Sequence, residues 1–164
     1  MSKTIYRLDP TGEDAMAKVR DQGFELPDSP TSQPTLPSDL DELDTKDLME
    51  EFLLFTAWAD YASAQVGLAV IAERSAELDL EFHISLHYES VPSRKSVTLA
   101  KAETLQNPDV YEARKKVEEA YAYRRVVADL AARYERDAAV LSRELTRRTS
   151  EFSPKATRRD RWEA

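Results

Sequence analysis

The sequence contains no cysteine and only three glycines, and these shortages exclude several kinds of site. Without cysteine there is neither a disulfide nor a cysteine-based zinc site. The glycines, at Gly12, Gly23 and Gly67, lie too far apart to form a phosphate-binding loop of the P-loop or dinucleotide type. Nucleotide hydrolysis is therefore not expected. The lack of cysteine also fits a reducing compartment, and we expect a cytoplasmic protein.

Long uncharged apolar runs are also missing. No stretch of about 18 such residues occurs, and the first residues, with Asp9, Glu13 and Asp14, lack the apolar centre of a signal peptide. We therefore expect a soluble protein that has no membrane partner.

Histidine is scarce as well, with His83 and His87 as the only examples. Their spacing of four residues on a helix would let both face one metal, with Glu77 or Glu81 adding a carboxylate. The residues between them do not include the glutamate of a metalloprotease helix, so structural polar positions are the better interpretation. No nucleophile elbow, triad or deaminase pattern is present. We expect no enzyme, no metal and no cofactor.

The dominant feature is a predicted helix of about 45 residues, some 65 Å long, between Asn107-Pro108 and Pro154. Asn107 supplies an N-cap and Pro108 suits the first turn. Apolar residues recur along it at alternating steps of three and four, which is a heptad pattern broken only by Arg124 and Arg148. This predicted seam consists of Val110, Ala113, Val117, Ala120, Val127, Ala131, Tyr134, Ala138, Leu141, Leu145 and Phe152.

A second long helix is predicted from Leu48 to His87, where no proline occurs. Its seam, interrupted by Glu73, is Leu48, Phe52, Phe55, Ala59, Ala62, Val66, Ala69, Ala76, Leu80 and His83. Further apolar lines run beside it, one of them through Leu53, Ala57, Ala64 and Ile71. Because residues 52 to 72 are apolar nearly all round, pairing with one helix leaves surface uncovered, and oligomerisation is expected.

The remaining segments complete an all-α architecture. Residues 1–37 hold five of the eight prolines and predict an acidic, disordered or loosely attached arm. Helix starts are predicted at Ser38 and Thr45. Residues of about 88–107 form a loop, or a loop with a short helix near Leu99 to Leu105. We expect residues 38–152 to form a long antiparallel, coiled-coil-like helical hairpin that assembles into a homo-oligomeric bundle or ring, with 153–164 as a basic tail. A spectrin-like or mostly dimeric coiled coil is the alternative.

Charge is distributed unevenly along the chain. Residues 1–60 carry five basic and fourteen acidic side chains, whereas residues 143–164 carry seven basic and four acidic ones. Arginines beside a tryptophan can pair phosphates and stack a base, as in sequence-tolerant single-strand binding. The candidate nucleic-acid-binding residues lie in the loop and at the C-terminal end: Arg94, Lys95, Lys101, Arg147, Arg148, Lys155, Arg158, Arg159, Arg161 and Trp162.

The layout resembles a known family. An aromatic-rich first helix with the run Phe52-Leu-Leu-Phe-Thr-Ala-Trp-Ala-Asp-Tyr61 precedes the segment Lys95-Ser-Val-Thr-Leu-Ala-Lys101 and a second long helix with a basic end. This order is similar to that of the small recombination mediators of tailed phages, the UvsY-like proteins. The resemblance covers roughly residues 48–152. The family's basic cluster in the first helix is missing, since Arg74 is the only base between Lys46 and Arg94.

The resemblance implies a ring-like homo-oligomer in the host cytoplasm that binds single-stranded DNA and contacts a RecA-type recombinase and a single-strand-binding protein. By position, Arg94, Lys95 and Lys101 match the family's DNA-contacting region. The leading hypothesis is thus a non-enzymatic recombination mediator that assists loading of the recombinase. The alternative is a helical scaffold, virion component or adaptor that binds no nucleic acid.

Overall fold

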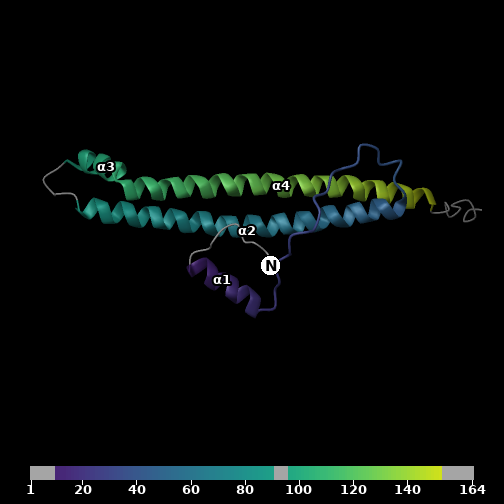
Figure 1. The fold of residues 1–164 in the computed structure, drawn as a ribbon, viewed down its shortest axis with the longest axis horizontal. Helices are drawn as coiled ribbons and strands as arrows, with labels where there is room; N and C mark the ends of the chain where they lie inside the picture. Colours follow the sequence, from purple (N-terminus) through teal and green to yellow (C-terminus); the bar gives the residue numbers. More distant parts are fainter. Residues whose placement is uncertain (1–9, 91–95, 153–164) are drawn as a thin grey trace, which may run out of the picture.

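The computed structural model describes residues 10–90 and 96–152, and this part of the chain is all-helical, as predicted. Four helices occur there (Figure 1): α1 (Pro10–Asp21), α2 (Thr45–Ser90), α3 (Val97–Gln106) and α4 (Pro108–Phe152). The two long helices lie side by side, α1 lies against α2, and α3 lies at one end of the assembly.

Helix α2 begins at the second of the two predicted starts. The Asp44 carboxylate accepts a hydrogen bond from the backbone N–H of Asp47 at 2.7 Å, and its carbonyl accepts from Leu48 N–H. Asp44 therefore caps the helix. The predicted start at Ser38 is wrong, because Asp39 instead accepts a hydrogen bond from the N–H of Asp41, two residues on. This local turn competes with helix formation.

Helix α4 begins as the sequence predicts. The Asn107 side-chain oxygen accepts from Asp109 N–H at 2.8 Å, and the Asn107 carbonyl accepts from Tyr111 N–H. Pro108 occupies the first turn, where its missing N–H leaves no intrahelical bond unmade. Forty-five residues then continue without interruption to Phe152.

Helices α2 and α4 run in opposite directions. Contacts between them join early residues of one helix to late residues of the other: Asp79 meets Lys116 at 3.7 Å, and Arg124 meets Glu73. The two predicted seams meet in this pair. Their most buried members are Leu48, Phe55, Ala59, Ala62 and Ala69 on α2, and Val110, Ala113, Ala120, Val127, Ala131, Tyr134, Ala138 and Leu141 on α4.

The best-packed part of the pair lies where α2 begins and α4 approaches its end. Phe55, Leu48 and Leu141 are fully buried there, and the Phe55 ring lies 6.3 Å from that of Tyr134. Burying one such apolar side chain contributes about 1.5–3 kcal/mol. Elsewhere much of the seam is alanine, so the helices approach closely but bury less surface per residue.

The charged residues that interrupt the two predicted seams contact each other. Arg124 of α4 donates from Nε to Glu73 of α2, and its Nη2 lies 3.4 Å from the other carboxylate oxygen of Glu73. The Arg124 guanidinium also lies 5.3 Å from the centre of the Tyr121 ring. Because only one alignment of the helices pairs these charges, the contact specifies the register of α2 on α4.

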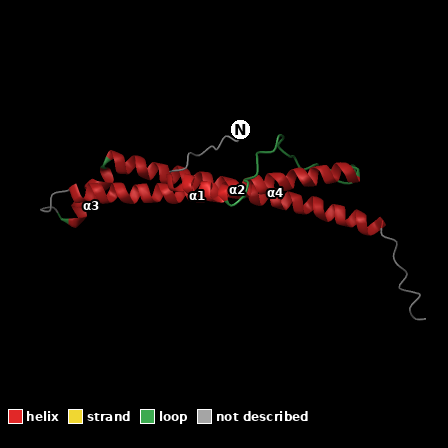
Figure 2. Cartoon of the chain, turned by 90° about the horizontal axis from the view of Figure 1, so that it is seen from below, coloured by secondary structure: helices red, strands yellow, loops and turns green. Residues whose placement is uncertain are grey.

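The acidic segment expected to be disordered contains ordered structure within its described part. Helix α1 packs on α2 with Met16 buried, and Gly23 ends it with a φ of 81°. Beyond α1 the chain runs along the long helices toward the start of α2 (Figure 2), and Leu36, Leu40 and Leu43 pack against the core. The expectation of a disordered or loosely attached arm concerns residues 1–37. Within their described part, α1 and Leu36 contact the long helices, and these tertiary contacts offset the entropic cost of ordering them. Residues 1–9 lie outside the described part.

Helix α3 corresponds to the short helix that was one of two alternatives for the connection. Ser96 caps it by accepting from Leu99 N–H at 3.4 Å, and Ala100 and Thr104 are buried beneath it. The Thr104 hydroxyl donates to the Ala100 carbonyl, so it brings no unpaired polar group into that contact. Residues 91–95 are not described.

Candidate interaction surfaces

An apolar stripe runs along the side of α2 that faces away from α4. We call it the outer stripe; it consists of Leu53, Ala57, Ala64, Ile71, Leu78, Phe82 and Leu86. At 100° per residue these positions fall within a quarter turn of one another and lie opposite the buried residues Phe55, Ala62 and Ala69. The α2–α4 contact therefore leaves the stripe uncovered. Helix α1 and the residues after it pack beside its middle part, where Leu68 is buried, so the exposed members lie on either side of that contact.

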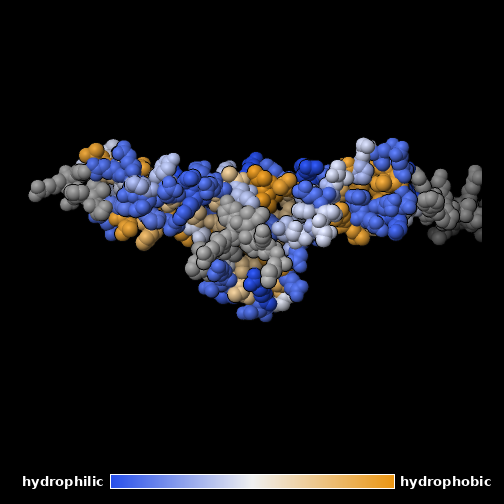
Figure 3. Space-filling model, in the orientation of Figure 1, coloured by the Kyte–Doolittle hydropathy of each residue, from blue (hydrophilic) through white to orange (hydrophobic). Residues whose placement is uncertain are grey.

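Several members of the outer stripe are large and exposed. Leu53 is 59% exposed, Leu78 50%, Phe82 62% and Leu86 50%. Figure 3 shows hydrophobic surface along the edge of the C-terminal half of α2 that lies away from α4. Scattered exposed apolar residues are normal on protein surfaces, whereas these residues form a line at helical spacing along one face of α2.

The predicted nucleic-acid-binding residues do not gather at one place in the described structure. Lys101 is exposed on α3, whereas Arg147 and Arg148 lie near the opposite end of the long helices (Figure 1). About 40 residues of α4 separate the two places, which is roughly 60 Å of helix. The other predicted positions lie outside the described residues: Arg94, Lys95, Lys155, Arg158, Arg159, Arg161 and Trp162.

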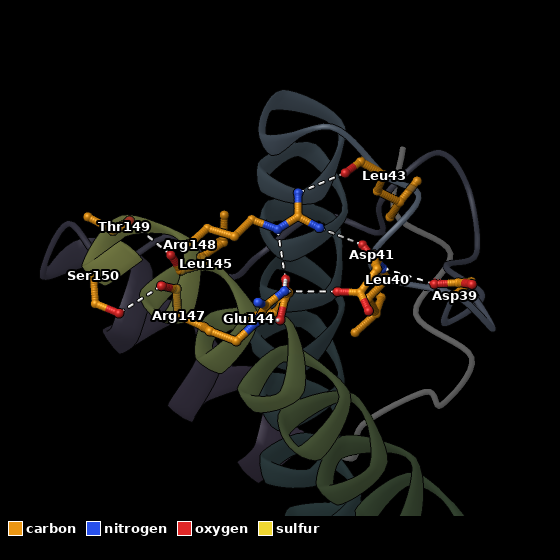
Figure 4. A network of polar contacts seen from close by, with 10 residues as sticks. All are labelled: Asp39, Leu40, Asp41, Leu43, Glu144, Leu145, Arg147, Arg148, Thr149 and Ser150. Atoms are coloured by element: carbon orange, nitrogen blue, oxygen red, sulfur yellow. Dashed lines mark hydrogen bonds and ion pairs between the residues drawn. The ribbon is translucent and has the colours of Figure 1, made fainter. Parts of the chain in front are cut away.

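Arg148 makes contacts that hold the turn before α2 against α4. Its side chain is only 12% exposed, and its guanidinium donates to Glu144 at 2.7 Å, to the Leu43 carbonyl at 2.7 Å and to the Leu40 carbonyl at 2.6 Å (Figure 4). Every nitrogen of the guanidinium thus donates to an acceptor within the chain. Arg148 therefore satisfies carbonyls of the turn that leads into α2, which explains why a charge can interrupt the seam.

Arg147 joins the same network from the exposed side. It donates to Glu144 at 2.7 and 2.8 Å and to Asp41 at 2.8 Å, while its side chain stays 49% exposed. Hydrogen bonds from Arg147, and then from Arg148, lower the pKa of Glu144 from 4.5 to about 2. The Glu144 carboxylate therefore remains ionised between two guanidinium groups over most of the acidic pH range.

The electrostatic character of the described structure is acidic. Residues 10–90 and 96–152 together carry 15 basic and 28 acidic side chains, net −13. Many cations of α4 also face carboxylates, as Lys115 does with Glu119 and Arg133 with Asp137. A polyanion gains little from such a surface.

The two histidines occupy polar positions between the long helices and the connection. His87 Nδ1 lies 3.1 Å from Asn107 Nδ2 and its Nε2 lies 3.3 Å from Asp109, while His83 Nε2 lies 3.6 Å from Asp79. The two rings are stacked with their centres 6.5 Å apart. Among the described residues, no three histidines or acids converge in a way that could hold a metal ion.

The chain matches no family model, no curated protein and no solved structure. Within residues 10–90 and 96–152, no helix is sufficiently long and apolar to cross a membrane. The resemblance to UvsY-like mediators stays a prediction.

Sequence analysis missed the C-terminal half of the outer stripe. The predicted apolar line through Leu53, Ala57 and Ala64 ends at Ile71, although Leu78, Phe82 and Leu86 continue it at helical spacing. These three residues are hard to distinguish in the sequence, because apolar residues of the predicted seam on the same helix alternate with them in this region.

Proposed function

We propose that this protein is a non-enzymatic helical scaffold or adaptor that self-associates through the outer stripe of α2. The observation that carries the proposal is the exposure of Leu53, Leu78, Phe82 and Leu86 on one face of a long helix. Copies that pack these faces together form a coiled-coil-like bundle, the assembly expected from the all-round apolar character of α2.

Covering the apolar face contributes more to the free energy of association than contacts between exposed charged groups do. Covering a largely exposed leucine or phenylalanine contributes on the order of 1 kcal/mol or more for each copy. Several such side chains along a rigid helix offset part of the entropic cost of association, because few side chains need to be ordered. Exposed ion pairs such as Lys115–Glu119 contribute little, since water and salt screen them.

The salt dependence of assembly tests the scaffold proposal. Molar mass is measured by light scattering at about 0.1 M and about 1 M salt, where screening lengths are about 10 and 3 Å. Association through apolar surfaces persists or strengthens at the higher salt concentration. A wild-type protein that stays monomeric at both salt concentrations, over the whole accessible range of protein concentration, contradicts the proposal.

A second candidate, the recombination mediator, is favoured by the composition of residues 153–164. This segment carries four basic and two acidic side chains together with Trp162, which is the opposite of the acidic balance in the described part. We propose as the alternative that an oligomer presents this weak basic segment several times and so gains avidity for single-stranded DNA, to assist a RecA-type recombinase in displacing a single-strand-binding protein. Lys101 lies at the other end of the long helices and would contact DNA separately.

Fluorescence anisotropy of a labelled single-stranded oligonucleotide distinguishes the two candidates. A mediator binds the oligonucleotide at low salt. The logarithm of its binding constant then falls with the logarithm of the salt concentration, with a slope of about −0.7 for each phosphate neutralised. The triple variant Arg158→Ala, Arg159→Ala, Trp162→Ala then binds more weakly than the wild type. Absence of binding at low salt by an oligomeric wild-type protein excludes the mediator and leaves the scaffold.

A further inference from the structure

Aromatic side chains gather on one side of the α2–α4 pair, in the N-terminal half of α2. The Trp58 ring lies 5.8 Å from that of Tyr61 and 5.5 Å from that of Tyr134. Next to them is a cleft of about 230 Å³ that is lined mainly by apolar and aromatic atoms. Its lining residues on the two long helices are Trp58, Tyr61, Ala62, Gln65, Tyr123, Val126, Val127, Leu130 and Tyr134.

A proline-containing segment of the same chain is seated at the edge of this cleft. The indole Nε1 of Trp58 donates a hydrogen bond to the carbonyl of Ser32. Pro34, two residues further along the chain, is buried. Residues 33–37 carry no helix, strand or turn, and both Pro34 and Pro37 fall within them. A tryptophan N–H can only donate, so it needs an acceptor, and the Ser32 carbonyl supplies one.

The cleft itself is incompletely filled by this segment. The segment contributes Gln33, a polar and exposed residue, to the lining, while Val126 stays 58% exposed and Leu130 39% exposed. The volume is several times the roughly 30 Å³ of a water molecule, which is room for one proline ring or one branched aliphatic side chain. The polar side chain of Gln33 therefore leaves part of the apolar lining uncovered.

We propose that this aromatic cleft is a binding site for an extended, proline-containing segment of a partner protein. The partner lies in the register of residues 32–34, with a carbonyl accepting from Trp58 Nε1 and an apolar side chain in the place of Gln33. Proline suits this mode because its fixed φ lowers the entropic cost of docking an extended chain on aromatic rings. The chain's own segment, residues 30–37, is then a weak tethered ligand that the partner displaces.

The inferred occupant is extended because the chain's own segment at this site is extended over residues 33–37, and Ser32 presents its carbonyl to the Trp58 indole. The proposal does not rest on self-association, because the cleft lies between α2 and α4, whereas the outer stripe faces away from α4.

Peptide binding to the full-length protein tests the proposal. The probe is a fluorescein-labelled peptide of residues 28–39 that carries Gln33→Leu, and its control has alanine in place of Pro30, Pro34 and Pro37. Val126→Arg fills the mouth of the cleft from an exposed position, and Val140→Arg is the matched control because Val140 is exposed on α4 outside the lining. Circular dichroism verifies that each variant retains its helices.

The expected result is saturable binding of the proline peptide by the wild type and by Val140→Arg. Val126→Arg weakens the affinity about tenfold or more, as loss of a central contact commonly does. Trp58→Phe, which keeps a ring but removes the donor, also weakens it. Pro34→Ala in the protein strengthens peptide binding several-fold, because a weaker tethered segment competes less.

Three results overturn the proposal. The first is absence of peptide binding even by the Pro34→Ala protein. The second is equal affinity of the Val126→Arg and Val140→Arg proteins, which would place any binding outside the cleft. The third is equal affinity for the proline peptide and the alanine peptide, which would show a general apolar surface, including one that pairs with a second copy.

Discussion

Replacing Phe55 by alanine tests the orientation of α2 against α4. Phe55 is fully buried in the cluster that contains Leu48, Tyr134 and Leu141. The substitution removes an aromatic side chain from a packed site and leaves a cavity between two helices whose backbones are fixed along their length. Phe55→Ala should therefore lower the free energy of unfolding by about 3–5 kcal/mol. That is a large part of the roughly 5–15 kcal/mol typical of a domain.

The assay is equilibrium unfolding in urea, followed by circular dichroism at low protein concentration, where association contributes least. The matched control is Leu53→Ala, two residues earlier on the same helix, since Leu53 is 59% exposed. Its effect should stay within about 0.5 kcal/mol, as for most surface substitutions. A loss of less than about 1 kcal/mol for Phe55→Ala, or an equal loss for Leu53→Ala, would refute the assignment of buried and exposed faces.

Three further predictions concern single features of the fold. Gly67→Ala should stabilise the protein by about 0.5–1 kcal/mol in thermal or urea unfolding, because an added Cβ meets nothing within 4 Å and α2 gains helix propensity; a destabilised variant would contradict this. The lowered pKa of Glu144 predicts that the free energy of unfolding falls as pH drops from 4.5 to about 2, with a shallower fall for Glu144→Gln; identical pH profiles would argue against the network. Glu73→Ala and Arg124→Ala should each destabilise the protein, and the double variant should lose less than the two single losses combined in the same urea assay; strict additivity would show that the pair is not coupled.

Much of the fold follows from the sequence, because the helix-capping residues and the heptad spacing of apolar residues predict the same long helices. Asn107 and Pro108 mark the start of α4, and the heptad spacing identifies the residues that become buried in the α2–α4 contact. Less local features are harder to predict. Of the two predicted helix starts, Thr45 begins α2, whereas the one at Ser38 is replaced by a turn at Asp39, since a side chain competes there for backbone N–H groups.

The order in the N-terminal segment also depends on tertiary contacts. The prolines and acidic residues of positions 1–37 resemble a disordered arm, yet α1 packs on α2 and Leu36 packs on the core. Just beyond the arm, Arg148 binds the carbonyls of Leu40 and Leu43. None of these contacts is local in sequence. Composition alone therefore underestimates how much of this segment is ordered by contacts with the long helices.

The interaction surfaces were only partly predictable for a related reason. Glu73 and Arg124 each appear as an interruption of a seam, and only the alignment of the two helices shows that they pair. The aromatic cleft has no sequence motif, because Trp58 and Tyr134 come from different helices and Gln33 comes from the preceding segment. Exposed residues of the outer stripe, in contrast, lie on one helix and can be found by spacing.

The most direct test of self-association is sedimentation velocity of the wild type beside Phe82→Glu and Val140→Glu over a wide range of protein concentrations. Phe82 lies on the outer stripe and is 62% exposed, whereas Val140 is exposed on α4, so both charges are tolerated by the isolated chain. We predict that the wild type and Val140→Glu associate with rising concentration, while Phe82→Glu sediments as a folded monomer. Identical association of Phe82→Glu and the wild type would contradict the assignment of the outer stripe as the assembly surface.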